Sequence, residues 1–156
     1  MNHTTAAAEI KRAWLTAWTG GPLAAMPVEQ DNLPFQQPVG QAWARLSIAN
    51  GETTKPSLGP PMTRTPFILQ LQVFLPEQTG TRKATQAADA LAVLNGTVTR
   101  SNGLIVRFYE AGVERGPDET GTATFLVSLP GTYDIDPNYA APVFPPPIII
   151  GPPPGP

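Results

Sequence analysis

The chain has no cysteine, one histidine and few charged residues. Without cysteine it has no disulfide, thiol nucleophile or cysteine zinc site, and a single His3 excludes every site that needs two imidazoles. Charged residues make up 14% of the 156 residues, against about 25% in an average soluble protein. We expect a surface with so little charge to be partly covered by partners.

Common catalytic motifs are also missing. The sequence has no Gly-rich phosphate or dinucleotide loop, no Gly-x-Ser-x-Gly elbow and no His-Glu-x-x-His helix. Glu114, Asp118 and Glu119 are more typical of a solvated turn than of a metal or acid–base site. Asp134 and Asp136, two positions apart, are likewise more typical of acids that follow a strand. The sequence therefore predicts a protein that is not an enzyme and has no catalytic residue, cofactor or metal.

The charge pattern bears on partners and location. A net charge of −2 and a pI near 5.3 give no reason to expect sequence-independent binding to nucleic acid or to anionic lipid. Glu9, Lys11 and Arg12 interrupt the apolar pattern of the first twenty residues, which therefore do not resemble a secretory signal. We expect the protein to fold in a cytoplasm and to bind no membrane.

Two segments have the spacing of amphipathic helices. The first places its apolar residues at i, i+3, i+4, i+7 and i+8 and ends before Gly20-Gly21-Pro22; these residues are Ile10, Ala13, Trp14, Ala17 and Trp18. The second ends at Asn95-Gly96 and carries Ala84, Ala87, Ala88, Leu91 and Leu94. Each helix therefore has one face to bury against a sheet.

Four segments alternate in the manner of half-buried strands, at residues 42–48, 67–75, 104–109 and 122–129. The order of one helix, two strands, one helix and two strands predicts an α+β two-layer sandwich. In this fold an antiparallel four-stranded sheet has both helices on one face, and residues 50–66 and 111–121 form loops between strands.

The second face of this sheet, which no helix is expected to cover, mixes apolar and basic side chains. Such a mixture is typical of a subunit interface. The candidate contact residues on this face and in the 50–66 loop are Trp43, Arg45, Lys55, Arg64, Phe74 and Arg107. The alternatives are scattered exposed apolar side chains and ordinary solubilising charge.

Proline separates the end of the chain from the rest. Residues 137–156 contain nine prolines and no charge, which predicts an extended polyproline II conformation. We place a domain boundary near Pro130, between a folded domain at 1–130 and a proline-rich C-terminal arm at 131–156. Large apolar side chains on the arm predict that it anchors on a neighbouring subunit or partner. The alternative is a free end. The predicted anchor residues are Tyr139, Phe144, Ile148, Ile149 and Ile150.

Several segments carry a resemblance to a known family. After the first helix, Asn-Leu-Pro-Phe-Gln-Gln-Pro at 32–38 leads into Trp-Ala-Arg-Leu-Ser-Ile at 43–48. Leu-Gln-Val-Phe-Leu-Pro follows at 71–76, and Gly80-Thr81 opens an alanine-rich helix. In this order the segments resemble the tail terminator (tail-completion) proteins of long-tailed bacteriophages, over about residues 6–130. The proline-rich arm departs from the compact ending of that family.

The resemblance implies a structural virion protein that assembles in the host cytoplasm. It implies a homohexameric ring that caps the head-proximal end of the tail tube, ends tube polymerisation and offers a docking face to head-closure or neck proteins. DNA then passes through the lumen without specific binding. The alternatives are another neck or tail component, such as a head–tail adaptor or tube protein, and a small enzyme or carbohydrate-binding module in which Trp43, Tyr109 and Tyr133 line a sugar cleft.

Overall fold

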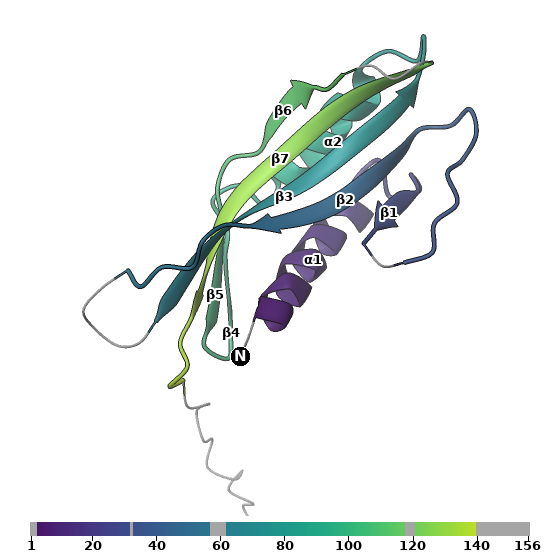
Figure 1. Cartoon of the computed structure of the whole chain (residues 1–156). Helices are drawn as coiled ribbons and strands as arrows, with labels where there is room; N and C mark the ends of the chain where they lie inside the picture. The colour runs from purple at the N-terminus through teal and green to yellow at the C-terminus, as the bar shows by residue number, and fades with distance from the viewer. Residues whose placement is uncertain (1–2, 32, 57–61, 118–120, 140–156) are drawn as a thin grey trace, which may run out of the picture.

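The computed structural model describes residues 3–31, 33–56, 62–117 and 121–139. Within these residues, two helices and seven strands form the fold, and the strands belong to one sheet (Figure 1). In chain order the elements are α1 (His3–Thr19), β1 (Val28–Gln30), β2 (Trp43–Asn50), β3 (Thr63–Pro76), α2 (Arg82–Ala92), β4 (Val98–Ser101), β5 (Leu104–Phe108), β6 (Gly112–Arg115) and β7 (Thr122–Ile135).

The sheet corrects the predicted strand number and arrangement. Its order is β1-β2-β3-β7-β5-β4, and β6 also pairs with β7. Strand β1 runs parallel to β2, whereas the other strand pairs are antiparallel. The protein is α+β overall, but the prediction of a four-stranded, purely antiparallel sheet is wrong.

The three strands that the sequence analysis missed are short. Strand β1 has three residues, β4 and β6 have four each, and all four residues of β6 are exposed. Strand β6 lies inside the 111–121 segment that was predicted to be a loop. Segments this short show no alternation that a sequence pattern could reveal. Pairing with a longer neighbour is what makes them strands.

One missed strand did have a local signal. Asn102 and Gly103 connect β4 to β5 and have φ values of 43° and 80°. A two-residue hairpin turn of type I′ requires positive φ at both positions, and Asn-Gly is the pair that most favours it. The Asn-Gly pair could therefore have predicted β4 before β5.

Strands β3 and β7 form the centre of the sheet (Figure 1). Each has 14 residues, and they pair along their whole length, from Thr63 opposite Ile135 to Pro76 opposite Thr122. Both strands extend beyond the predicted segments because each continues through a proline, Pro66 in β3 and Pro130 in β7, a residue that is unusual inside strands. The predicted boundary near Pro130 falls within β7.

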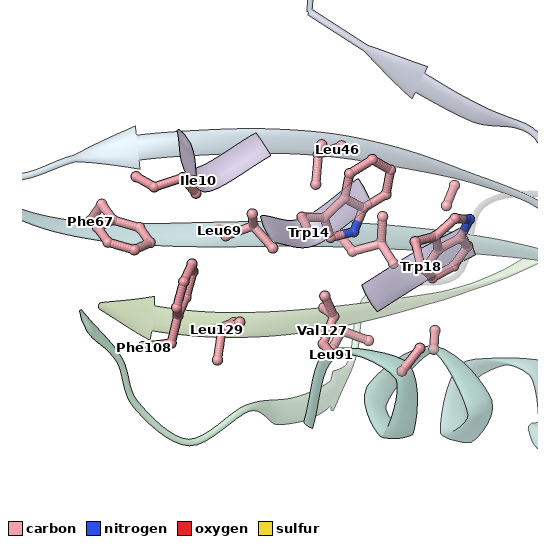
Figure 2. Packing of buried hydrophobic residues seen from close by; sticks show 14 of the residues in the cluster. Ile10, Trp14, Trp18, Leu46, Phe67, Leu69, Leu91, Phe108, Val127 and Leu129 are labelled. Atoms are coloured by element: carbon pink, nitrogen blue, oxygen red, sulfur yellow. The ribbon is translucent and has the colours of Figure 1, made fainter. Parts of the chain in front are cut away.

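Both helices pack on the same face of the sheet and close a single core (Figure 2). Figure 2 shows Ile10, Trp14 and Trp18 following one another along α1 over the sheet. The Trp14 and Trp18 rings are stacked with centroids 5.8 Å apart. From the strands, the fully buried side chains include Leu46, Phe67, Leu69, Leu71, Phe108, Val127 and Leu129. The predicted helix stripes thus meet the inward-pointing residues of the strands.

Replacing Trp14 by alanine is expected to lower the free energy of unfolding by about 3–5 kcal/mol, because Trp14 is 2% exposed and its removal leaves a cavity under α1. The matched control is Leu15→Ala on the solvent side of the same helix, where Leu15 is 48% exposed and a change within about 0.5 kcal/mol is expected. Urea unfolding followed by circular dichroism measures both. Equal losses in the two variants would contradict this packing of α1.

Candidate interaction surface

One face of the sheet has no helix over it in the described part of the chain, and we call it the outer face. In β2, β3, β5 and β7, every second side chain points into the core, and the side chains between them point to the outer face. Along β3, a charged cluster lies at Arg64, an aromatic cluster lies at Phe74, and an apolar patch lies between them at Ile68.

The charged cluster joins Asp134 on β7 to Arg64 on β3 and Arg107 on β5. Arg64 lies opposite Asp134 in the strand register and donates from Nε to Oδ1 at 2.7 Å and from Nη2 to Oδ2 at 2.9 Å. Arg107 donates from Nη1 to Oδ2. The Asp134 side chain is completely buried, whereas those of Arg64 and Arg107 are 41% and 31% exposed. Two guanidinium groups on one carboxylate leave a net positive charge facing solvent.

The cluster changes the titration of its members. The hydrogen bond from Arg64 lowers the pKa of Asp134; burial opposes this shift, and the hydrogen bond and charge of Arg107 reinforce it. The hydrogen bond and charge of Asp134 likewise raise the pKa of Arg64. Because the pKa of Asp134 is lower in the folded chain than in the unfolded one, the cluster stabilises the fold above about pH 4 and loses this contribution as the pH falls further.

The aromatic cluster is built on Trp43 and Phe74, which are paired in register and stack with ring centroids 4.0 Å apart. Phe35 packs on Trp43 at a centroid distance of 5.5 Å. The Arg45 guanidinium lies 5.6 Å from the centroid of the Trp43 ring, and its Nε donates to Glu29 Oε2 at 2.6 Å. Trp43 and Phe74 are therefore only 8% and 4% exposed. A partner that binds here contacts Arg45 rather than either ring.

The apolar patch, which we call the Ile68 patch, consists of Ala49, Pro66, Ile68, Tyr109 and Pro130. Ile68 lies opposite Ala49 of β2 and Pro130 of β7 in the register. The Tyr109 N–H donates to the Pro130 carbonyl at 2.9 Å. Ile68 is 41% exposed and Tyr109 48%. Exposed apolar side chains bordered by charged groups have the composition of a protein contact.

The six predicted contact residues lie in different parts of the outer face and its adjoining segment. Arg64 and Arg107 both donate hydrogen bonds to Asp134 at one end of this face. Trp43, Arg45 and Phe74 meet at the other end of the outer face. Lys55 is exposed and follows Thr54, whose backbone exchanges two hydrogen bonds of 2.8 Å with Arg64. A role for these residues in binding stays a prediction.

Of the predicted arm anchors, Tyr139 is in the described part of the chain, whereas Phe144, Ile148, Ile149 and Ile150 lie outside it. Tyr139 packs against Gly103 at the β4–β5 turn, where an added Cβ would lie 2.5 Å from the Tyr139 Cβ. The Asp136 N–H donates to the Gly103 carbonyl at 2.9 Å. The end of the described chain is thus held on this turn.

The residues suggested for a sugar cleft are not brought together. Tyr133 is 1% exposed on the core side and shares a 2.6 Å hydrogen bond with His3, whereas Trp43 and Tyr109 lie in different groups on the outer face. Across residues 3–139, leaving out the gaps given above, no three His, Asp or Glu side chains gather in a way that could hold a metal ion. No helix in the same residues is long and apolar enough to cross a membrane.

Sequence reasoning missed two parts of this surface. It placed Asp134 after the end of a strand, although Asp134 lies within β7 and organises two arginines from other strands. It did not include Ile68 among the candidate contact residues and did not bring Pro130 beside it. Both contacts depend on which strands are neighbours, and no local signal in the sequence supplies that.

Replacing Asp134 by asparagine is expected to lower the free energy of unfolding at pH 7 by about 1.5–3 kcal/mol, because two charge-assisted hydrogen bond partners lose their carboxylate. The difference from the unmodified chain should shrink below about pH 4, because there the carboxyl of the unfolded chain takes up a proton that the folded chain, with its lowered pKa, binds less readily. Urea unfolding between pH 3 and pH 7 measures this, with Asp136→Asn as the matched control. A pH-independent difference would contradict the ion cluster.

Comparisons with known proteins identify the family. Residues 5–130 match the family described as phage tail terminator protein. A solved structure aligns with the chain at a TM-score of 0.59 and 25% sequence identity, over 90% of this chain and 95% of that one. No curated protein matches. Since the family match spans most of the sequence, the chain belongs to the phage tail terminator family and is a structural protein of the virion tail.

Proposed function

We propose that this chain forms a ring, a homohexamer, on the head-proximal end of the tail tube. There it ends tube polymerisation and provides the docking face for head-closure or neck proteins. The observation that carries the proposal is the Ile68 patch, an exposed apolar surface on an uncovered sheet face in a member of the tail terminator family.

A closed ring needs two different contact surfaces on each subunit, because a contact between two identical surfaces ends at a dimer. The Ile68 patch is one of these surfaces. The second is the exposed side of α1, where Leu15 is 48% exposed. Arg45 on one side of the patch and Arg64 on the other border the apolar contact with charge, which fixes the orientation of the neighbour.

Besides bordering the ring contact through Arg64, the charged cluster serves contacts outside the ring. Arg64, Arg107 and Asp134 together carry one net positive charge, and Lys55 follows the segment bonded to Arg64. This end of the outer face suits an acidic surface of the tube or neck proteins. It also suits a lumen through which DNA passes without specific binding, because a weak positive charge attracts the backbone but reads no bases.

Replacing Ile68 by aspartate is expected to convert the ring into single chains while leaving the fold intact, because Ile68 is 41% exposed and its removal leaves no core cavity. Native mass spectrometry gives the mass of the assembly, and circular dichroism gives the fold. The matched control is Val39→Asp, at a side chain that is 96% exposed and lies outside the outer face; it should keep the mass of the unmodified assembly.

Three outcomes would refute parts of the proposal. A monomeric unmodified chain would refute the ring. Long cylinders in electron micrographs of the purified protein would identify a tube protein instead, because a terminator stops at a closed ring. A ring that persists in the Ile68→Asp variant would remove the Ile68 patch from the interface while leaving the ring itself in place.

A further inference from the structure

The proposed function leaves an open groove between the two helices unused. The groove has a volume of about 620 Å³ and lies between α1, the end of α2 and β4. Small side chains leave this space, and its lining includes Ala13, Ala17, Ala90, Val93, Leu94 and Thr99. Glu9, paired with Arg12, and Asp89 also line the groove. Val93 is 68% exposed, so the groove leaves apolar surface in contact with water.

The end of the described chain lies close to this groove. Tyr139 is held on the β4–β5 turn by its contact with Gly103. Thr99, which lines the groove, belongs to β4, the strand that ends at this turn. Thr99 lies four positions before Gly103, and since a strand rises about 3.3 Å per residue, the two are at most about 13 Å apart. The arm therefore begins one short strand away from the groove.

The arm carries the bulky apolar side chains that the groove has room for. Residues 140–156 carry no charge and include Val143, Phe144 and the run Ile148–Ile150. In polyproline II geometry, 17 residues extend about 53 Å, which is enough to pass along β4 and to follow the groove. Five of the lining residues are alanine or glycine, namely Ala13, Ala17, Gly20, Gly21 and Ala90, so the groove has room for bulky side chains from the arm.

We propose that residues 143–150 dock into the groove between α1 and α2 of the same chain. The occupant is the chain's own arm because a short tether gives an effective concentration of about 1 mM, far above the concentration of other copies in a dilute solution. Docking covers Val93 with apolar side chains. It also replaces the predicted anchoring on a neighbouring subunit by an anchoring within one subunit.

The absence of cysteine allows a direct crosslinking test in the full-length chain. The pair Thr16→Cys and Ile149→Cys places one thiol at an exposed groove residue and the other on the arm. The matched control pair is Glu52→Cys and Ile149→Cys, with an exposed position outside both the groove and the Ile68 patch. Both pairs keep Ile148 and Ile150, and because burial of one isoleucine favours the docked state by about tenfold, we expect the disulfide of the groove pair to form about ten times faster.

The readout is the mobility of the oxidised chain on a non-reducing gel. An intramolecular disulfide whose rate does not depend on protein concentration supports the proposal. Adding Val93→Asp to the groove pair, at a side chain too exposed to affect folding, should reduce the rate to that of the control pair. Equal rates for the two pairs, an unchanged rate with Val93→Asp, or disulfide-linked dimers as the main product would overturn it.

Discussion

The pairing of β3 with β7 is the contact on which the rest of the sheet depends. Strand β2 joins the sheet by pairing with β3, and β5 and β6 join it by pairing with β7. The same two strands carry core residues such as Leu69 and Leu129 and the outer-face residues Arg64, Ile68 and Asp134. Because successive side chains point to opposite faces, one register fixes the core and the interaction surface together.

The buried carboxylate of Asp134 reinforces this register. A buried charge is costly unless it is paired, and Asp134 is paired with arginines from both strands that flank β7. A slip of one residue would turn Asp134 towards the core and separate it from both partners. The ion cluster that charges one end of the outer face therefore also opposes wrong pairings of the central strands.

The surface of the protein fits a structural role in the tail. The outer face has an apolar centre between two charged borders, and the helical layer has an apolar groove near the point where the arm leaves the domain. The aromatic cluster differs from the others, because Phe35 and Arg45 already cover Trp43 and Phe74. It stabilises the end of β2 and β3, and its contribution to a contact comes through the charge of Arg45.

The sequence by itself determined both helices, the four longer strands and the family. Each of these depends on short-range spacing, such as the stripe from Ile10 to Trp18, or on segments that are contiguous in the chain. Tertiary structure alone decided that β1 and β6 are strands, that Trp43 is buried, and that Arg64 meets Asp134 across 70 positions. A side chain's local pattern shows which face it occupies, but only the packing of distant segments selects its neighbours on that face.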